Sequence, residues 1–258
     1  MKRNTLTYCG FLATCVLSSL SHAEELWVTA GTTEDLSARR APYHFVVPDG
    51  KSAGDIVDIA IDGKNNTCFV WFRGSPRQVS AGSSDNLGKY RKPYTSSFPE
   101  NYDSGDVVGI AINEKAGDTG YSRTDETTFV FFRDGRYTAG TTDQPYQPER
   151  FYRYVPADGK SYDDIVAIAM DGDFEIKKSS QVSSVHLVAY AWYRDGTVSA
   201  GFMPTYIDRS YGAMAKLDSY RKPYNYKLPK NWKPGMEILG IGIDGENNHV
   251  YTWYRTKD

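Results

Sequence analysis

Three short elements of the chain join an arginine to a tyrosine in a pattern that suits the recognition of sugars. Each element reads Arg-x-Pro-Tyr, and the copies occupy residues 40–43, 91–94 and 221–224. An arginine guanidinium donates hydrogen bonds to hydroxyl or carboxylate groups, and a tyrosine ring stacks on the face of a sugar. In two copies another tyrosine directly precedes the arginine. The predicted ligand-binding residues are Arg40, Tyr43, Tyr90, Arg91, Tyr94, Tyr220, Arg221 and Tyr224.

The same elements also suit a structural role. Arginine and tyrosine can fasten an outer β-strand to its own sheet, and the proline restricts each element to an edge strand or a loop. Both interpretations stay open at the level of sequence.

Acidic residues at the ends of apolar runs offer oxygen ligands for a hard cation. Asp62, Asp171 and Asp244 end three such runs, and a ring of their carboxylates predicts a calcium site. Asp62 and Asp244 are each followed by Gly-x-Asn-Asn, a pattern that indicates a turn before it indicates a metal site. No other cofactor is expected.

Support for catalysis is weak. Beyond the first 23 residues the histidines are His44, His186 and His249, and none has a repeated or motif-defined partner. The chain has no His-Glu-x-x-His helix and no phosphate-binding loop. We therefore expect a protein that is not an enzyme, although paired acids for glycoside cleavage could converge from distant positions.

The elements that must position these residues recur through the chain. An apolar run is followed by an aromatic run that ends in arginine, and then by a (Val/Tyr)-(Ser/Thr)-Ala-Gly run. The apolar runs occupy residues 55–62, 106–113, 164–171 and 237–244. The aromatic runs occupy residues 69–73, 129–133, 190–194 and 251–255. Such runs predict β-strands, and Asp-Gly after two of the aromatic runs predicts tight hairpins.

The fourth copy of this repeat is split between the two ends of the chain. Its first two runs are the last strands of the sequence, and its third run is residues 28–31. A tandem array whose end units complete one another leaves no open edges. With the Arg-x-Pro-Tyr elements as fourth strands, the repeat predicts an all-β fold, a four-bladed β-propeller in a single domain over residues 24–258. Another closed, pseudo-symmetric β-barrel is the alternative.

Two residue types within the strands carry further predictions. The arginine that ends each aromatic run is expected to stack on the tryptophan two positions earlier, as in Trp71, Trp192 or Trp253. Cys68 takes a place that is small or apolar in the other copies, so we expect a buried and unreactive thiol.

The first 23 residues resemble a secretory signal peptide. Lys2 and Arg3 precede an apolar segment, and Ser21 and Ala23 suit signal peptidase cleavage. A lipoprotein signal at Cys15 is the less favoured alternative. Without this segment 28 basic and 32 acidic residues remain, a net charge of −4. We expect a periplasmic or secreted protein that neither binds nucleic acid nor inserts into a membrane.

Insertions distinguish the four copies. They occupy residues 114–127, 172–188 and 202–216, and in an up-and-down blade all three leave from the same end of the ring. Exposed aromatic residues and methionine favour interfaces. Phe202, Met203, Tyr206 and Tyr211 are therefore the predicted partner-binding residues. Tolerated loop growth is the alternative explanation.

In its repeat architecture the chain resembles secreted β-propellers in general, which implies non-enzymatic recognition. The first functional hypothesis is a lectin-like protein that binds a glycan through the Arg-x-Pro-Tyr elements. The second is an exported inhibitor or immunity-type protein that grips one envelope or secreted protein with the insertion-rich face.

Overall fold

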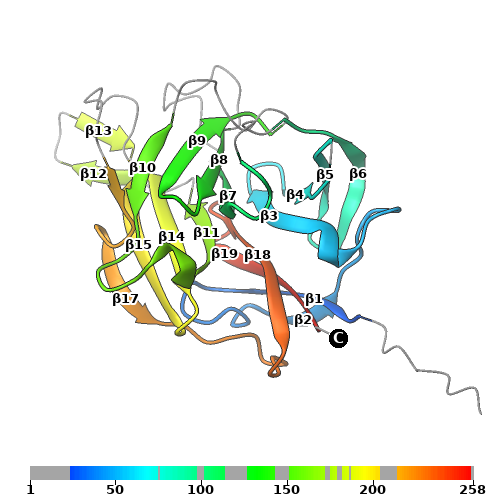
Figure 1. The fold of residues 1–258 in the computed structure, drawn as a ribbon. Coiled ribbons are helices and arrows are strands. Elements are labelled where there is room, and N and C mark those ends of the chain that lie inside the picture. The colour runs from blue at the N-terminus through cyan, green and yellow to red at the C-terminus, as the bar shows by residue number, and fades with distance from the viewer. Residues whose placement is uncertain are drawn as a thin grey trace, which may run out of the picture.

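Four small sheets form a ring, and this arrangement confirms the predicted four-bladed β-propeller (Figure 1). The structure is a computed structural model. It describes residues 24–74, 76–97, 102–113, 127–142, 151–171, 175–178, 182–185, 187–203 and 214–256. No helix in these ranges is long and apolar enough to cross a membrane.

Each blade has four strands that lie side by side, in order from the ring axis to the outer rim. Blade 1 contains β3 (Ile56–Asp62), β4 (Thr67–Phe72), β5 (Gln78–Ser83) and β6 (Asn86–Thr95). Blade 2 contains β7 (Val107–Asn113), β8 (Thr127–Phe132), β9 (Arg136–Gly140) and β10 (Tyr152–Val155). Blade 3 contains β11 (Ile165–Asp171), β14 (Leu187–Tyr193), β15 (Thr197–Met203) and β17 (Arg221–Asn225).

Blade 4 joins the two ends of the chain, as the split repeat predicts. Its inner strands are β18 (Met236–Asp244) and β19 (His249–Thr256), and its outer strands are β1 (Leu26–Gly31) and β2 (Arg40–His44). Strand β1 pairs with β19 over six residues, with Ala30 opposite Tyr251. The ring is therefore closed by backbone hydrogen bonds between residues more than 200 positions apart.

Three further strands belong to insertions. β12 (Glu175–Lys178) and β13 (Val182–Val185) form a separate hairpin after β11. β16 (Met214–Lys216) leaves blade 3 and pairs in parallel with β10, which makes blade 2 a five-stranded sheet.

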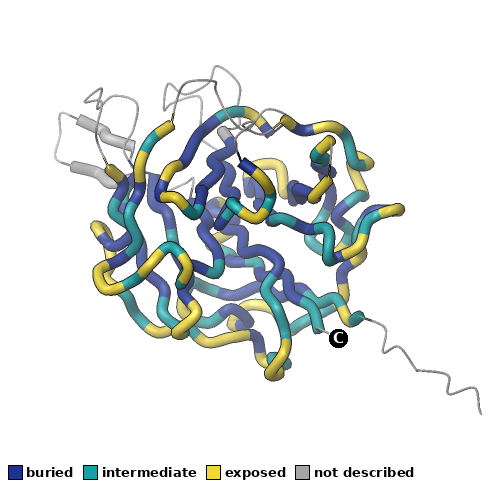
Figure 2. The backbone as a smooth tube through the Cα atoms, in the orientation of Figure 1, coloured by how far each residue is buried: buried dark blue, intermediate teal, exposed yellow. Residues whose placement is uncertain are grey.

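The core lies between the blades. Buried residues follow the strands around the axis (Figure 2), and the described residues form four hydrophobic clusters, one between each pair of adjacent blades. Along β4, Phe69 and Trp71 pack toward blade 2, while Val70 and Phe72 pack toward blade 4. This alternation follows from the two-residue period of a strand whose two faces are both covered. Cys68 is buried, as predicted, and burial raises the pKa of its thiol.

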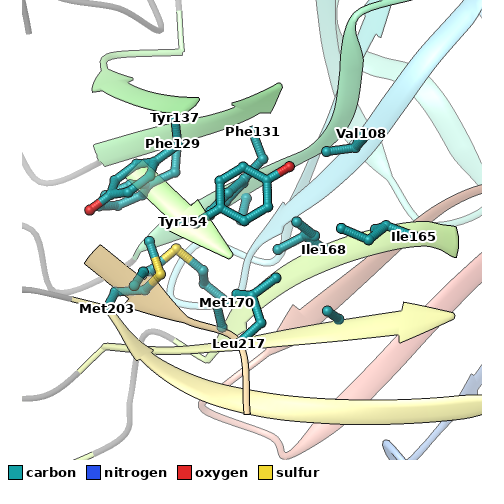
Figure 3. Packing of buried hydrophobic residues seen from close by; sticks show 14 of the residues in the cluster. Val108, Phe129, Phe131, Tyr137, Tyr154, Ile165, Ile168, Met170, Met203 and Leu217 are labelled. Carbon is teal, nitrogen blue, oxygen red and sulfur yellow. The ribbon is translucent and has the colours of Figure 1, made fainter. Parts of the chain in front are cut away.

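The cluster between blades 2 and 3 shows how aromatic and aliphatic residues share this packing (Figure 3). Phe131 stacks on Tyr137 at 5.5 Å between ring centroids and meets Tyr154 edge-on at 5.4 Å. Ile168 and Met170 reach the same cluster from β11.

A repeated turn joins neighbouring blades through a backbone hydrogen bond, and we call this turn the hook. After the Ala-Gly run the chain reverses direction, and the N–H of a buried leucine donates to a backbone oxygen of the preceding blade. The bonds are Leu36 to Lys227, Leu87 to Val46 and Leu217 to Val155, at 3.0 to 3.1 Å. Glycine is required beside the hook, because a Cβ on Gly31, Gly82 or Gly201 would lie 2.0 Å from a backbone oxygen. The Ser or Thr of the run also bonds into its own blade, as Ser80 Oγ does to Leu87 O at 2.7 Å.

Candidate functional site

The three Arg-x-Pro-Tyr elements form the same side-chain arrangement on three outer strands. Within each element the arginine guanidinium covers the tyrosine ring. The distances from guanidinium carbon to ring centroid are 3.6 Å for Arg40 and Tyr43, 3.2 Å for Arg91 and Tyr94, and 3.5 Å for Arg221 and Tyr224. We call these pairs the Arg–Tyr stacks. They lie on β2, β6 and β17, at the outer rim of blades 4, 1 and 3.

The tyrosines of two stacks reach across to the next blade. Tyr43 Oη lies 2.8 Å from Ser84 Oγ of blade 1, and Tyr224 Oη donates to Thr33 Oγ1 of blade 4 at 3.0 Å. Burial raises the pKa of both tyrosines, so both hydroxyls stay protonated at neutral pH. The Arg–Tyr stacks therefore sit at junctions between blades, with the tyrosine ring held at both ends.

The arginines of the stacks stay exposed, whereas the stacked tyrosines are half-buried. Arg221 also pairs with Glu34 of blade 4 at 2.8 Å. Tyr90 and Tyr220, which precede two of these arginines, are 55% and 43% exposed. The predicted ligand-binding residues thus comprise three half-buried tyrosines, three exposed arginines and two exposed tyrosines, Tyr90 and Tyr220.

Blade 2 departs from the alignment that the sequence suggests. Residues 151–154, Phe-Tyr-Arg-Tyr, take the place of the Arg-x-Pro-Tyr element in this blade, but Tyr152, not Tyr154, lies opposite Tyr137 on β9. This is the register of Tyr94 opposite Val79 in blade 1. Residue 149, three positions before Tyr152, is glutamate in the sequence.

Of the four predicted partner-binding residues, the structure describes Phe202 and Met203. Met203 is only 1% exposed and belongs to the core between blades 2 and 3, so its assignment as a contact residue is wrong. It is the last residue of β15, and its place opposite Leu187 turns it inward. Phe202 is half-buried and packs on Tyr220, with ring centroids 5.1 Å apart. Tyr206 and Tyr211 lie outside the described residues.

The predicted calcium ligands do not converge. Asp62 accepts hydrogen bonds from the backbone and side chain of Asn65, and Asp244 does the same for Asn247. Both aspartates therefore act as turn residues in their own hairpins, and Asp171 ends β11. In the described ranges no three acidic, histidine or cysteine side chains gather in a way that could hold a metal ion.

The histidines that the structure describes serve local packing. His44 stacks on Trp27 at 3.9 Å, and its Nδ1 lies 3.2 Å from Leu26 O. His249 meets Tyr251 edge-on at 6.1 Å. His186 lies outside the described residues.

Residues 50–54 match the Gly-x-Ser-x-Gly spacing of a nucleophile elbow. The match has a structural explanation. Ser52 opens the short 3-10 helix η1 (Ala53–Asp55), and its hydroxyl donates to Asp55 at 2.8 Å. An elbow needs a strand before the serine, and residues 47–52 form none.

The arginines that end the aromatic runs were predicted to stack on tryptophans, and this prediction is wrong. Trp71, Trp192 and Trp253 are fully buried between blades, on the faces of their sheets. The arginines instead lie at the ends of the strands, three of them one residue beyond the last strand residue and Arg255 next to last in β19, and all four line one cavity of about 840 Å³ at the centre of the ring. They are Arg73, Arg133, Arg194 and Arg255. Their equal position in the repeat was the sequence signal for this shared location.

Comparison of the sequence with protein-family models and with curated proteins finds no match.

Proposed function

We propose that the protein is an exported, non-enzymatic recognition protein that binds carbohydrate at its outer rim. The observation that carries this proposal is the threefold repetition of an exposed arginine held over a tyrosine ring at a junction between blades.

Preorganisation supports a binding role for these arginines. A free arginine loses side-chain entropy when it binds a ligand, and a guanidinium already resting on a fixed ring loses less. The ring is fixed because its hydroxyl bonds to the next blade, as in Tyr43 and Tyr224. A guanidinium has five N–H donors, so an exposed arginine that keeps its present contacts can also donate to hydroxyl or carboxylate groups of a sugar.

An exposed tyrosine beside the arginine distinguishes two of the three Arg–Tyr stacks. Tyr90 beside Arg91 and Tyr220 beside Arg221 offer exposed rings on which a sugar can stack. In blade 4 the residue before Arg40 is Arg39, which offers no ring. We therefore expect stronger binding at blades 1 and 3 than at blade 4.

A glycan array with the mature protein tests this proposal. Binding of a defined group of glycans is expected, and Tyr90→Ala with Tyr220→Ala should weaken it about tenfold, the effect of losing one or two aromatic contacts. Phe151→Ala is the matched control, because Phe151 is also an exposed aromatic residue, 38% exposed, but precedes no Arg–Tyr stack. No glycan binding, or equal losses in both variants, would refute the proposal.

A second candidate function is the binding of one protein partner by the insertion-rich face. The contact between Phe202 and Tyr220 favours it, because this aromatic pair lies where the insertion of residues 202–216 leaves blade 3. A pull-down from envelope extract tests this alternative. Capture of one protein that is lost on Phe202→Ala, but retained when Arg40, Arg91 and Arg221 are changed to glutamine, would favour it over the glycan proposal.

A further inference from the structure

One arginine of each blade lies at the same place beside the ring axis. The backbone N–H of Arg73, Arg133 and Arg194 donates to the oxygen of the residue just before the inner strand of its blade, at 2.7 to 2.9 Å. Arg255 lies opposite Glu237 at the start of β18. The strand ends therefore fix four guanidinium groups around one opening.

The opening leads into the central cavity, whose volume is about 840 Å³. Its wall is made by the first residues of the inner strands, including Val57, Val107 and Val166, and Trp232 lines it from the segment before β18. The volume is within the range of small-molecule sites in proteins. The cavity lies at the end of the ring where the inner strands begin, opposite the end from which the insertions leave.

The four arginines differ in how far carboxylates neutralise them. Arg255 pairs with Glu24 and Glu237, both at 2.7 Å, and Arg133 pairs with Asp163 at 2.8 Å. Arg194 donates its Nε–H to the backbone oxygen of Asp163 at 3.1 Å. Within the described part of the chain, Arg73 and Arg194 form no ion pair with a carboxylate. Among the charged residues that line the cavity, the four arginines outnumber the two acidic residues, Asp58 and Glu237.

One acidic residue, Asp58, lies deeper in the cavity than the arginines, on the third residue of β3. Its side chain is buried, and its two oxygens accept the backbone N–H groups of Ile59 at 2.8 Å and Ile110 at 2.5 Å. Because both oxygens are already occupied, Asp58 offers little to a cation. A ligand is therefore oriented by the opening and not by Asp58.

We propose that this opening binds a small polyanion, a molecule with two or more carboxylate or phosphate groups. Arginine is suited to such groups because its planar fork makes paired hydrogen bonds to them. Arg73 and Arg194, which form no ion pair within the described ranges, are the principal ligands. The site is separate from the Arg–Tyr stacks and does not depend on glycan binding.

Isothermal titration with citrate, tripolyphosphate and inorganic phosphate tests the proposal. We expect one saturable site per chain for citrate or tripolyphosphate, with weaker binding of inorganic phosphate. Loss of two charge-assisted contacts in Arg73→Gln with Arg194→Gln should weaken binding roughly ten- to hundredfold. The control is Arg39→Gln with Arg153→Gln, which removes the same charge from exposed positions that do not line the cavity.

Two results would overturn the proposal. One is the absence of saturable binding by all three anions. The other is an equal loss of affinity in both double variants, which would show that only net charge matters. If the cavity variant fails to fold, titration of wild-type protein followed through the NMR signals of arginine Nε–H groups decides the question. Shifts confined to four arginine signals support the site, and no shifts contradict it.

Discussion

The tyrosine of the outer strand is packed differently in blade 2 and in the other three blades. In blade 2, Tyr152 stacks on Tyr137 of the neighbouring strand at 5.2 Å. In blades 1, 3 and 4 the residue opposite the tyrosine is valine, and the tyrosine ring is covered by an arginine of its own strand.

This difference bears on the role of the Arg–Tyr stacks. Blade 2 holds β10 with buried aromatic contacts and with β16, which pairs along its outer edge. An outer strand can therefore be held by aromatic packing and strand pairing. The arginines of the other blades are therefore not the only means of holding an outer strand. The following predictions test how far the stability of the blades and the proposed binding depend on different residues.

The hook between blades should give the largest effect on stability. In Gly82→Ala the new Cβ would lie 2.0 Å from Asn86 O and 2.6 Å from the carbonyl carbon of Leu87, so the hook must move. We expect a loss of about 3 kcal/mol or more in the free energy of unfolding, measured by chemical denaturation. In the control Gly54→Ala the nearest atoms are 3.5 Å away, and the loss should stay below about 1 kcal/mol. Similar losses in both variants would contradict the role of the hook.

Asp58 marks a second difference between blades, because its place on the inner strand is taken by Gly109, Ala167 and Gly240 elsewhere. Burial raises the pKa of Asp58 well above its ordinary value. The folded state then holds a proton that the unfolded state loses near pH 4, so wild-type stability falls as the pH rises from about 4 toward the folded-state pKa.

Denaturation of Asp58→Ala across this pH range checks the effect. The variant lacks the titrating group, so its stability relative to wild type should improve with rising pH, by about 1.4 kcal/mol per unit of pKa difference. Asp49→Ala, which removes an exposed carboxylate, is the control. A constant difference between Asp58→Ala and wild type at all pH values would contradict the raised pKa.

Two tyrosines whose hydroxyls bond to a backbone oxygen allow the stability of blades 2 and 3 to be compared directly. Tyr154 is buried and its hydroxyl donates to Phe132 O at 2.7 Å, whereas Tyr226 donates to Tyr193 O at 3.4 Å and is half-buried. Tyr154→Phe should lose about 1.5 kcal/mol of unfolding free energy, and Tyr226→Phe less than about 0.5 kcal/mol. Equal losses would mean that the outer strands of the two blades are held alike.

The ion pair between Arg221 and Glu34 should give the smallest effect. Both side chains are about half exposed, so water and salt screen the attraction. Glu34→Gln is expected to change the free energy of unfolding by less than about 0.5 kcal/mol. A larger loss that persists in high salt would show that the Arg–Tyr stack of blade 3 is chiefly structural.

The sequence was sufficient to predict the ring and its closure. Four copies of strongly apolar and aromatic runs, with one copy split between residues 28–31 and the last strands, leave few other ways to bury the strand edges. Positive φ at Gly135 and Gly196 also matches the predicted Asp-Gly hairpins. These features are local or repeated, so they can be read without coordinates.

Features that depend on contacts between blades were harder to predict. The inward turn of Met203 follows from its register with Leu187, and the hydroxyl bonds of Tyr43 and Tyr224 follow from how neighbouring blades meet. The arginines beside the cavity were misassigned because a two-residue period places them on the tryptophan face. For Arg73, Arg133 and Arg194 that period ends one residue earlier, with the strand, whereas Arg255 reaches the cavity from within β19.

Titration of the favoured glycan against wild type and against the combined variant Arg40→Gln, Arg91→Gln and Arg221→Gln tests the central claim most directly. Arg153→Gln, on the outer strand of blade 2, is the control. The account predicts more than one site per chain in wild type, an affinity at least tenfold lower in the combined variant, and no change in the control. Unchanged affinity in a combined variant that retains its melting temperature would contradict it.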